Sequence, residues 1–330
     1  MLRQTNFHLS MQEKHEHIAV VGVLQFQDQA APLFKPAGRL WMELDADSVG
    51  LIDHEAREPL APLLQDGRVE VDELYLPRQK LSLLSSWIDS PQVDWSEKLK
   101  DTVSQMTHGM EQAAAGPRFQ GTLLPYQQNG LNWLAHLYRC GFSGLLADEM
   151  GLGKTVQVLA FFSRLRTNLP ILIVAPTSLL FNWSRECAKF LPDLPTYIHS
   201  GKDRLQDPLE MQKLPVVITS YALLRLDETL LSQVHFEVIL LDESQAIKNK
   251  GTQTAQSASR LKGNFRLCLS GTPIENRKEE FVSQFHFLLP DLLSEKDSVE
   301  HLKRKSRPFF LRRSKGEVDM ELPEKREQVL

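Results

Sequence analysis

Five short apolar runs, separated by segments of helical length, are the feature that most constrains the fold of this chain. Each run is five or six residues long and apolar on both faces, which is typical of strands in a parallel sheet covered by helices on both sides. The pattern therefore predicts an α/β fold whose ligands bind at the carboxyl ends of the strands. The runs are SGLLA (143–147), ILIVA (171–175), VVITS (216–220), EVILLD (237–242) and FRLCLS (265–270).

A change in sequence character near the small-residue stretch AAAGP (113–117) predicts a boundary between two regions. Residues 1–115 contain short β-like runs followed by two predicted helices, at 77–89 and about 95–114. We expect a small α+β region of unknown role there, and the α/β domain over residues 116–330.

The composition indicates the cellular environment of the protein but does not indicate its function. The three cysteines lie far apart and lack the spacing of a zinc site or of a disulfide framework. No apolar run approaches the roughly 18 residues needed to span a bilayer. We therefore expect a soluble cytoplasmic protein with no membrane partner, nucleoid-associated in a bacterium or nuclear in a eukaryote.

The net charge of −4 conceals an uneven distribution of charged residues. Residues 1–115 hold 10 basic and 18 acidic side chains, whereas residues 116–330 hold 28 and 24. Seven Lys and Arg residues and no acid fall between positions 302 and 316. Such a cluster can hold nucleic-acid phosphates through counterion release. A solvated charged face, or a nuclear-import signal in a eukaryote, is the alternative.

The segment DEMGLGKT (148–155) follows the first run and precedes a helix-like segment, which is the order that a phosphate-binding loop needs. Gly151 and Gly153 allow backbone N–H groups to point at phosphate. Lys154 is expected to reach the β- and γ-phosphates, and Thr155 to ligate Mg²⁺. An ordinary left-handed turn is the alternative. The predicted nucleotide-binding residues here are Asp148, Glu149, Met150, Gly151, Leu152, Gly153, Lys154 and Thr155.

Two adjacent carboxylates end the fourth run. Asp242 is expected to hold Mg²⁺ and Glu243 to polarise the attacking water, so that these two and Lys154 are the predicted catalytic residues. Adjacent acids at a strand end can instead cap a helix. Paired with the glycine loop, they favour a nucleoside-triphosphatase.

These motifs, in this order, resemble the Swi/Snf-type family of helicase-like ATPases in helicase superfamily two, over residues 120–330. An Asp148 in place of the usual first glycine is characteristic of that family, and DESQAIKN (242–249) is similar to its acidic motif. The resemblance implies a RecA-like lobe that binds ATP and Mg²⁺. It also implies a DNA-dependent ATPase that translocates on double-stranded DNA and remodels protein–DNA complexes, with RNA polymerase or another DNA-bound protein as a candidate partner.

In other segments the resemblance to the family implies roles for individual residues. LLPYQQNGLNWL (123–134) resembles the family's adenine-reading segment and assigns an adenine contact to Gln127, which is compatible with an amphipathic helix whose apolar face is buried. DNA contact or coupling is assigned in four more segments, although small hydroxylated residues at strand ends also cap helices. These residues are Pro176 and Thr177, then Thr219, Ser220 and Tyr221, then Ser270, Gly271 and Thr272, and finally Arg312 and Arg313 in the exit segment, residues 302–330.

The sequence stops where a family member would enter its second RecA-like lobe. We therefore expect this chain to bind nucleotide but to hydrolyse it slowly alone, because in the family the second lobe supplies arginine fingers. The compact spacing of the motifs favours a bacterial member. Two other classes stay open: a strand-separating helicase of the same superfamily, and a non-catalytic lobe that serves as a nucleotide-binding scaffold.

Overall fold

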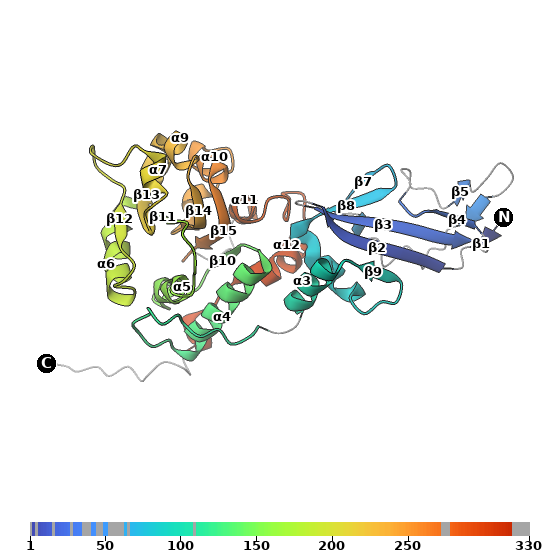
Figure 1. Ribbon diagram of the computed structural model, residues 1–330, viewed down its shortest axis with the longest axis horizontal. Helices are drawn as coiled ribbons and strands as arrows, with labels where there is room; N and C mark the ends of the chain where they lie inside the picture. The colour runs from blue at the N-terminus through green and yellow to red at the C-terminus, as the bar shows by residue number, and fades with distance from the viewer. Residues whose placement is uncertain are drawn as a thin grey trace. The chain divides into compact units, whose positions relative to one another are not determined.

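The computed structural model divides the chain into two compact units, residues 1–109 and 110–330 (Figure 1). The division precedes the predicted boundary because residues 113–116 belong to the second unit: Ala113 N–H donates to Asn132 Oδ1, and Gly116 N–H donates to Ser163 Oγ. Within the described part of the chain, no helix has the length and apolar character to cross a membrane. The structure describes residues 2–3, 6–14, 17–26, 29–34, 41–43, 49–51, 63–64, 67–107, 110–271 and 278–318.

The first unit contains a mixed sheet with strand order β7-β8-β3-β2-β9, to which β4 is added beside β3. Its longest pair, β2 (Asn6–Lys14) and β3 (His17–Phe26), is antiparallel and buries alternate residues such as Leu9 and Met11. One of the β-like runs of the first region, RVEVDELYL (68–76), is interrupted at Val71, whose φ of 57° belongs to a turn. The remaining elements are β1 (Leu2–Arg3), β4 (Gln29–Pro32), β5 (Trp41–Glu43), β6 (Val49–Leu51), β7 (Arg68–Glu70), β8 (Glu73–Pro77), η2 (Arg78–Trp87), β9 (Val93–Trp95) and α3 (Glu97–Thr107).

The second unit is built on a seven-stranded sheet in which every pair is parallel, with strand order β12-β13-β11-β14-β15-β10-β16. All five strands predicted from the apolar runs are confirmed. Strands β11 and β13 are buried at every residue, because helices cover both faces of the sheet. The strands are β10 (Gly144–Leu146), β11 (Ile171–Ala175), β12 (Thr196–Ile198), β13 (Val216–Ser220), β14 (His235–Leu241), β15 (Lys262–Leu269) and β16 (Phe310–Leu311).

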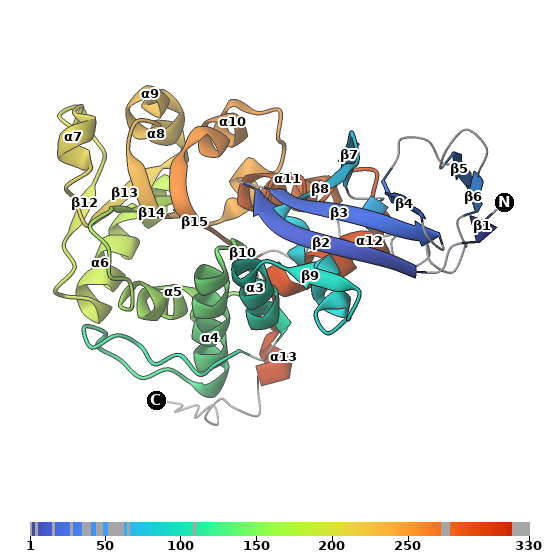
Figure 2. The same ribbon diagram turned by 45° about the vertical axis from the view of Figure 1, so that its right-hand side comes forward.

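Helices connect these strands and flank the sheet (Figure 2). The longest of them, α4 (Pro125–Cys140), begins with a proline at its first position and ends at Gly141, whose φ of 72° is left-handed.

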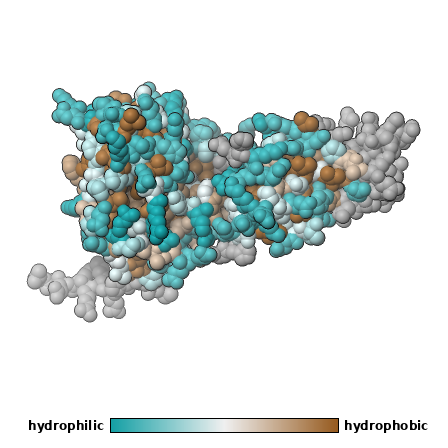
Figure 3. All heavy atoms as spheres, viewed as in Figure 1, coloured by the Kyte–Doolittle hydropathy of each residue, from teal (hydrophilic) through white to brown (hydrophobic). Residues whose placement is uncertain are grey.

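Hydrophilic side chains predominate on the face drawn in Figure 3, with apolar residues scattered among them. The other helices are α5 (Lys154–Phe162), η3 (Thr177–Leu179), α6 (Leu180–Phe190), α7 (Pro208–Met211), α8 (Tyr221–Leu226), α9 (Glu228–Leu231), η4 (Ser244–Ile247), α10 (Gln253–Arg260), α11 (Lys278–Leu288), α12 (Val299–Ser306), η6 (Arg307–Phe309) and α13 (Lys315–Val318).

The two edge strands of this sheet, β12 and β16, were not among the predicted strands. Their residues are only half-buried, and β16 is two residues long, so neither has the continuous apolar run of a central strand. Because all strands are parallel, the loops after β10, β11, β13, β14 and β15 emerge at one edge of the sheet. That edge holds the predicted site residues.

Candidate nucleotide-binding site

The phosphate-binding loop connects β10 to the first turn of α5. Gly151 and Gly153 adopt left-handed φ values of 92° and 73°, which side chains with a Cβ rarely tolerate. A Cβ on Gly153 would also lie 2.6 Å from Nε2 of Gln127. Lys154 and Thr155 follow directly as the first two residues of α5, where the free N–H groups of a helix favour an anion.

The Lys154 ammonium is surrounded by a backbone carbonyl and by three acidic side chains. Its Nζ donates to the carbonyl oxygen of Asp148 at 2.6 Å. Burial lowers the pKa of the amine, and the negative charges of Asp148, Glu243 and Asp242 oppose that effect. The lysine is therefore held by the loop's own carbonyl and faces the acids that follow β14.

Asp242 is fixed by two hydrogen bonds. Its Oδ1 accepts the N–H of Glu243 at 2.9 Å, and its Oδ2 accepts the indole N–H of Trp183 at 2.8 Å. Burial raises the pKa of this carboxyl, and the bond from Trp183 counteracts the rise. Trp183 lies in α6 and is almost completely buried. The sequence did not mark it as a site residue, since a buried tryptophan on a helix is ordinary core.

Glu243 occupies a backbone conformation that is uncommon for its residue type, with a φ of 49°. It precedes η4 at the N-cap position, but its carboxylate accepts no capping hydrogen bond from the backbone of that helix. It accepts a hydrogen bond from Nε2 of Gln245 instead, at 2.7 Å. Strained backbone conformations of this kind cluster at active sites and ligand-binding loops. The helix-cap interpretation of this acid is therefore not what the structure shows.

The residues at this edge fit Mg²⁺ bound together with nucleotide. In the described ranges, no group of three or more His, Cys, Asp or Glu side chains is arranged to hold a metal ion by itself. Mg²⁺ in phosphate-transfer sites commonly takes one or two protein oxygens and completes its octahedron with phosphate and water. The Thr155 hydroxyl and the Asp242 carboxylate are oxygen donors of that kind.

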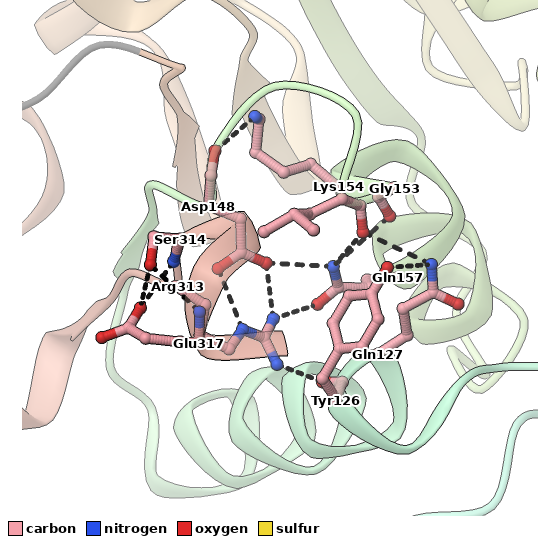
Figure 4. Close-up of polar contacts among 10 residues, drawn as sticks. Tyr126, Gln127, Asp148, Gly153, Lys154, Gln157, Arg313, Ser314 and Glu317 are labelled. Atoms are coloured by element: carbon pink, nitrogen blue, oxygen red, sulfur yellow. Dashed lines mark hydrogen bonds and ion pairs between the residues drawn. The ribbon is translucent and has the colours of Figure 1, made fainter. Parts of the chain in front are cut away.

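The side chain of Asp148 is held inside the lobe, while nucleotide binding by this residue stays a prediction. Its carboxylate is fully buried and accepts Nε of Arg313 at 3.0 Å, Nη2 of Arg313 at 2.5 Å and Nε2 of Gln157 at 3.1 Å (Figure 4). Arg313 also donates to Oε1 of Gln157 at 2.8 Å and to the carbonyl of Tyr126. The DNA contact predicted for Arg313 does not fit this placement, because its guanidinium points into the lobe and is 14% exposed.

Gln127 lies against the phosphate loop with its amide buried. Its Oε1 accepts the N–H of Leu124 at 3.0 Å, which satisfies the backbone donor just before α4. Its Nε2 donates to the carbonyl of Leu152 and to the hydroxyl of Tyr126, both at 3.3 Å. The structure thus joins the predicted adenine-reading segment to the loop, while adenine contact by Gln127 stays a prediction.

The hydroxylated residues at the end of β13 have structural partners. Thr219 is fully buried and donates to the carbonyl of His199 at 3.1 Å. Ser220 caps α8 with its side chain, as the alternative interpretation held. The Tyr221 hydroxyl donates to the carbonyl of Asp242 at 2.7 Å, so this segment contacts the acidic motif. None of the three hydroxyls is directed outward in this arrangement.

Two other predicted DNA-contact positions are more accessible. Thr177 is exposed after β11, beside the half-buried Pro176, and Arg312 is exposed in the exit segment. The structure places Thr177 at the carboxyl edge of the sheet, close in sequence to α6.

The segment after β15 reaches the phosphate loop. Ser270 is buried, and a Cβ on Gly271 would lie 2.9 Å from Cγ of Met150 and 3.9 Å from Nζ of Lys154. The predicted coupling segment therefore begins beside the nucleotide lysine. Thr272 falls outside the described residues.

A parallel α/β lobe with a phosphate loop opposite a pair of carboxylates defines a nucleoside-triphosphate-binding lobe, and comparison with known proteins gives its family. The SNF2-related domain matches residues 126–330. The chain belongs to this family.

Relatives of this chain include bacterial and eukaryotic proteins. YwqA of Bacillus subtilis, whose name places it among ATP-dependent helicases and translocases, is 37% identical over 322 residues, which cover 89% of this chain and 34% of that protein. The chromatin-remodeling ATPase ISW1 of Saccharomyces cerevisiae is 36% identical over 63% of this chain and 21% of its own length. The chain thus spans about a third or less of these relatives.

A solved structure confirms the architecture of the second unit. The SWI2/SNF2 ATPase core of Sulfolobus solfataricus in complex with double-stranded DNA is 35% identical, with a TM-score of 0.59, over 64% of this chain and 49% of that one. The predicted RecA-like lobe is therefore confirmed as the lobe of such an ATPase core.

Proposed function

We propose that this chain carries the ATP-binding lobe of a DNA-dependent ATPase that translocates on double-stranded DNA and remodels protein–DNA complexes. One observation carries the proposal. The acids after β14, Asp242 and Glu243, lie close enough to Lys154 of the phosphate loop to interact with its charge, although they are far from it in sequence. The Lys154 ammonium has three N–H donors and donates to the carbonyl of Asp148. To Glu243 we assign the role of polarising the attacking water.

Mg²⁺, when bound, would shield the phosphate charges and orient the γ-phosphate. Thr155 and Asp242 would supply its protein oxygens. Asp242 must then be ionised, although burial favours its protonated form. The hydrogen bond from Trp183 favours the carboxylate and thereby supports metal binding.

Binding to double-stranded DNA is supported by membership of the family and by the similarity to the Sulfolobus ATPase core, whose structure contains a DNA duplex. We propose that Thr177 and Arg312 take part in backbone contacts, since both are exposed and phosphate contacts position a duplex without reading its sequence. RNA polymerase or another DNA-bound protein as the target, and a cytoplasmic or nucleoid location, belong to the same proposal.

A non-catalytic scaffold lobe is the second candidate, and the chemistry of the site argues against it. Lys154, Thr155, Asp242 and Glu243 are all present, and Asp242 has a buried hydrogen-bond donor in Trp183. A lobe without catalytic function has no need of a buried, hydrogen-bonded carboxylate, because such a group costs stability.

The decisive experiment is ATP hydrolysis with and without duplex DNA. Two proteins are compared: this chain, and this chain joined to the part of the Bacillus subtilis relative that follows the matched region. We expect DNA to stimulate hydrolysis in the joined protein and to have little effect on the chain alone, because in the family the second lobe supplies the arginine fingers that contact the nucleotide. Nucleotide binding without hydrolysis in either protein would favour the scaffold. Strand separation by the joined protein would favour the helicase.

A further inference from the structure

The C-terminal clasp, as we call residues 310–318, is attached to the phosphate loop along its backbone. Strand β16 pairs with β10, so that Phe310 and Leu311 lie opposite the last two residues before the loop. The hydrogen bonding then continues past the strand: Ala147 N–H donates to the carbonyl of Leu311 at 2.7 Å, and Glu149 N–H donates to the carbonyl of Arg313 at 2.9 Å. Backbone contacts therefore follow the loop itself.

The second attachment is the buried ion pair of Arg313 and Asp148. The guanidinium and the carboxylate meet through two hydrogen bonds, and both groups also contact Gln157 of α5. Arg313 lies over the ring of Tyr126 as well, 5.4 Å from its centroid. A buried pair is costly to desolvate, and removal of either partner leaves an uncompensated charge. Separation of the clasp from the loop would therefore cost free energy.

The third attachment is apolar. Val318, at the end of α13, packs with Leu152 of the phosphate loop and Tyr126 of α4 in one buried cluster, against which Leu124 also lies. Lys315 adds a polar contact, since its N–H donates to Oε2 of Glu149 at 2.8 Å. Backbone, ionic and apolar contacts thus all join the clasp to the same short loop.

From these three sets of contacts we propose that the clasp is part of the nucleotide site, with Arg313 as a positioning residue, so that nucleotide binding and clasp docking stabilise each other. Asp148 is the link. Its carboxylate is held by Arg313, and its carbonyl holds Lys154. Movement of the clasp would shift the backbone that positions the lysine. Phosphate bound by Lys154 and by the N–H groups of the loop would order the same backbone. The inference rests on the proposed function.

Coupling of this kind is reciprocal: whatever factor the docked clasp adds to nucleotide affinity, nucleotide adds to clasp docking. Two measurements on the whole chain test separately the effect of the clasp on nucleotide binding and the effect of nucleotide on the clasp. One is the affinity for a fluorescent ATP analogue. The other is amide hydrogen exchange at residues 145–152 and 310–318, with and without the same analogue and Mg²⁺.

For the wild type we expect the analogue to slow exchange in both segments. Arg313→Gln is expected to weaken analogue binding about tenfold and to remove the protection of residues 310–318. Asp148→Asn alone should do the same. The double variant Asp148→Asn/Arg313→Gln, which leaves no buried charge without a partner, should bind more tightly than either single variant. Arg304→Gln, a change of the same type at an exposed position of α12, is the control.

Each outcome has a distinct meaning. If the wild type binds no analogue, the proposed function fails. If the wild type binds while exchange at 310–318 is unchanged and Arg313→Gln binds normally, the coupling is wrong although the site stands. Should Arg313→Gln fail to fold, Arg313→Lys and the wild-type exchange experiment still decide the matter: the lysine keeps the charge but loses the paired hydrogen bonds, and full wild-type affinity would overturn the positioning role.

Discussion

The indole N–H of Trp183 donates to Oδ2 of Asp242 at 2.8 Å, across 59 positions of sequence. This bond lowers the pKa of a carboxyl whose pKa burial raises. The folded pKa of Asp242 therefore lies above its ordinary value, and the carboxylate forms only as the pH rises through it.

Trp183→Phe keeps an aromatic ring at this position but removes the hydrogen bond, so the pKa of Asp242 should rise further. We expect the acid limb of the ATP hydrolysis profile, measured in the joined protein, to move to higher pH by about half to one unit, the equivalent of one hydrogen bond. Trp133→Phe, at another buried tryptophan, is the control. An unchanged acid limb would mean that Asp242 does not govern it.

Lys154→Ala and Glu243→Gln should separate binding from hydrolysis. The first removes the ammonium that reaches the phosphates and should weaken nucleotide binding by about 3 kcal/mol, roughly 100-fold. The second keeps the shape of the side chain and should spare binding while slowing hydrolysis in the joined protein by about 10² to 10⁴. Titration and turnover are measured on the same preparations. If both variants hydrolyse ATP normally, the site assignment is wrong.

Gly130→Ala should destabilise the lobe even though alanine favours a helix by about 1 kcal/mol. A Cβ at this position of α4 would lie 1.8 Å from Oε1 of Gln157 and 3.0 Å from Nη2 of Arg313. Overpacking of this kind costs about 1–3 kcal/mol, so we expect a net loss in chemical denaturation. Gly316→Ala has open space around its Cβ and serves as the control. A Gly130 variant more stable than wild type would contradict the network's geometry.

Asp227 stabilises the lobe away from the nucleotide. Its carboxylate accepts two hydrogen bonds from Arg204 and one contact from the buried His199. The hydrogen bond from Arg204, above all, lowers the pKa of Asp227 from the ordinary 3.8. The stabilisation is therefore present above that value and is lost as the pH falls through the folded pKa.

Asp227→Asn should accordingly lower the free energy of unfolding at pH 7 by about 3 kcal/mol. The difference from wild type should persist down to about pH 4 and close below it. Asp193→Asn, at an exposed carboxylate, should change little at any pH. A deficit that stays constant under acid would show that Asp227 acts by packing and not by charge.

Arg312→Gln should weaken duplex binding at every sequence to a similar extent and reduce the dependence of log affinity on log salt by about one. Fluorescence anisotropy over a range of salt concentrations measures both effects. Lys262→Gln, at the amino end of β15 on the opposite edge of the sheet, is the control. Equal affinity and slope for both variants would remove Arg312 from the DNA interface.

Local sequence was sufficient for much of the fold and of the site. The central strands are short apolar runs, and the loops after them contain glycine, lysine and paired acids next to one another in sequence. Positions such as Lys154 and Glu243 could therefore be identified from their sequence neighbours. The short edge strand β16 and the interrupted run around Val71 were not, because a half-buried strand has no strong pattern and a single left-handed residue leaves no apolar signature.

The sequence by itself determined the order of strands and loops, and hence which residues meet at the carboxyl edge of the sheet. The tertiary structure alone decided which side chains become partners. Asp148 and Arg313 are 165 positions apart, and nothing local distinguishes a basic residue that faces solvent from one that enters the lobe. Burial decides, because a guanidinium inside the fold needs acceptors for its N–H groups. Asp148 supplies two of them to Arg313, and only the folded chain brings the two residues together.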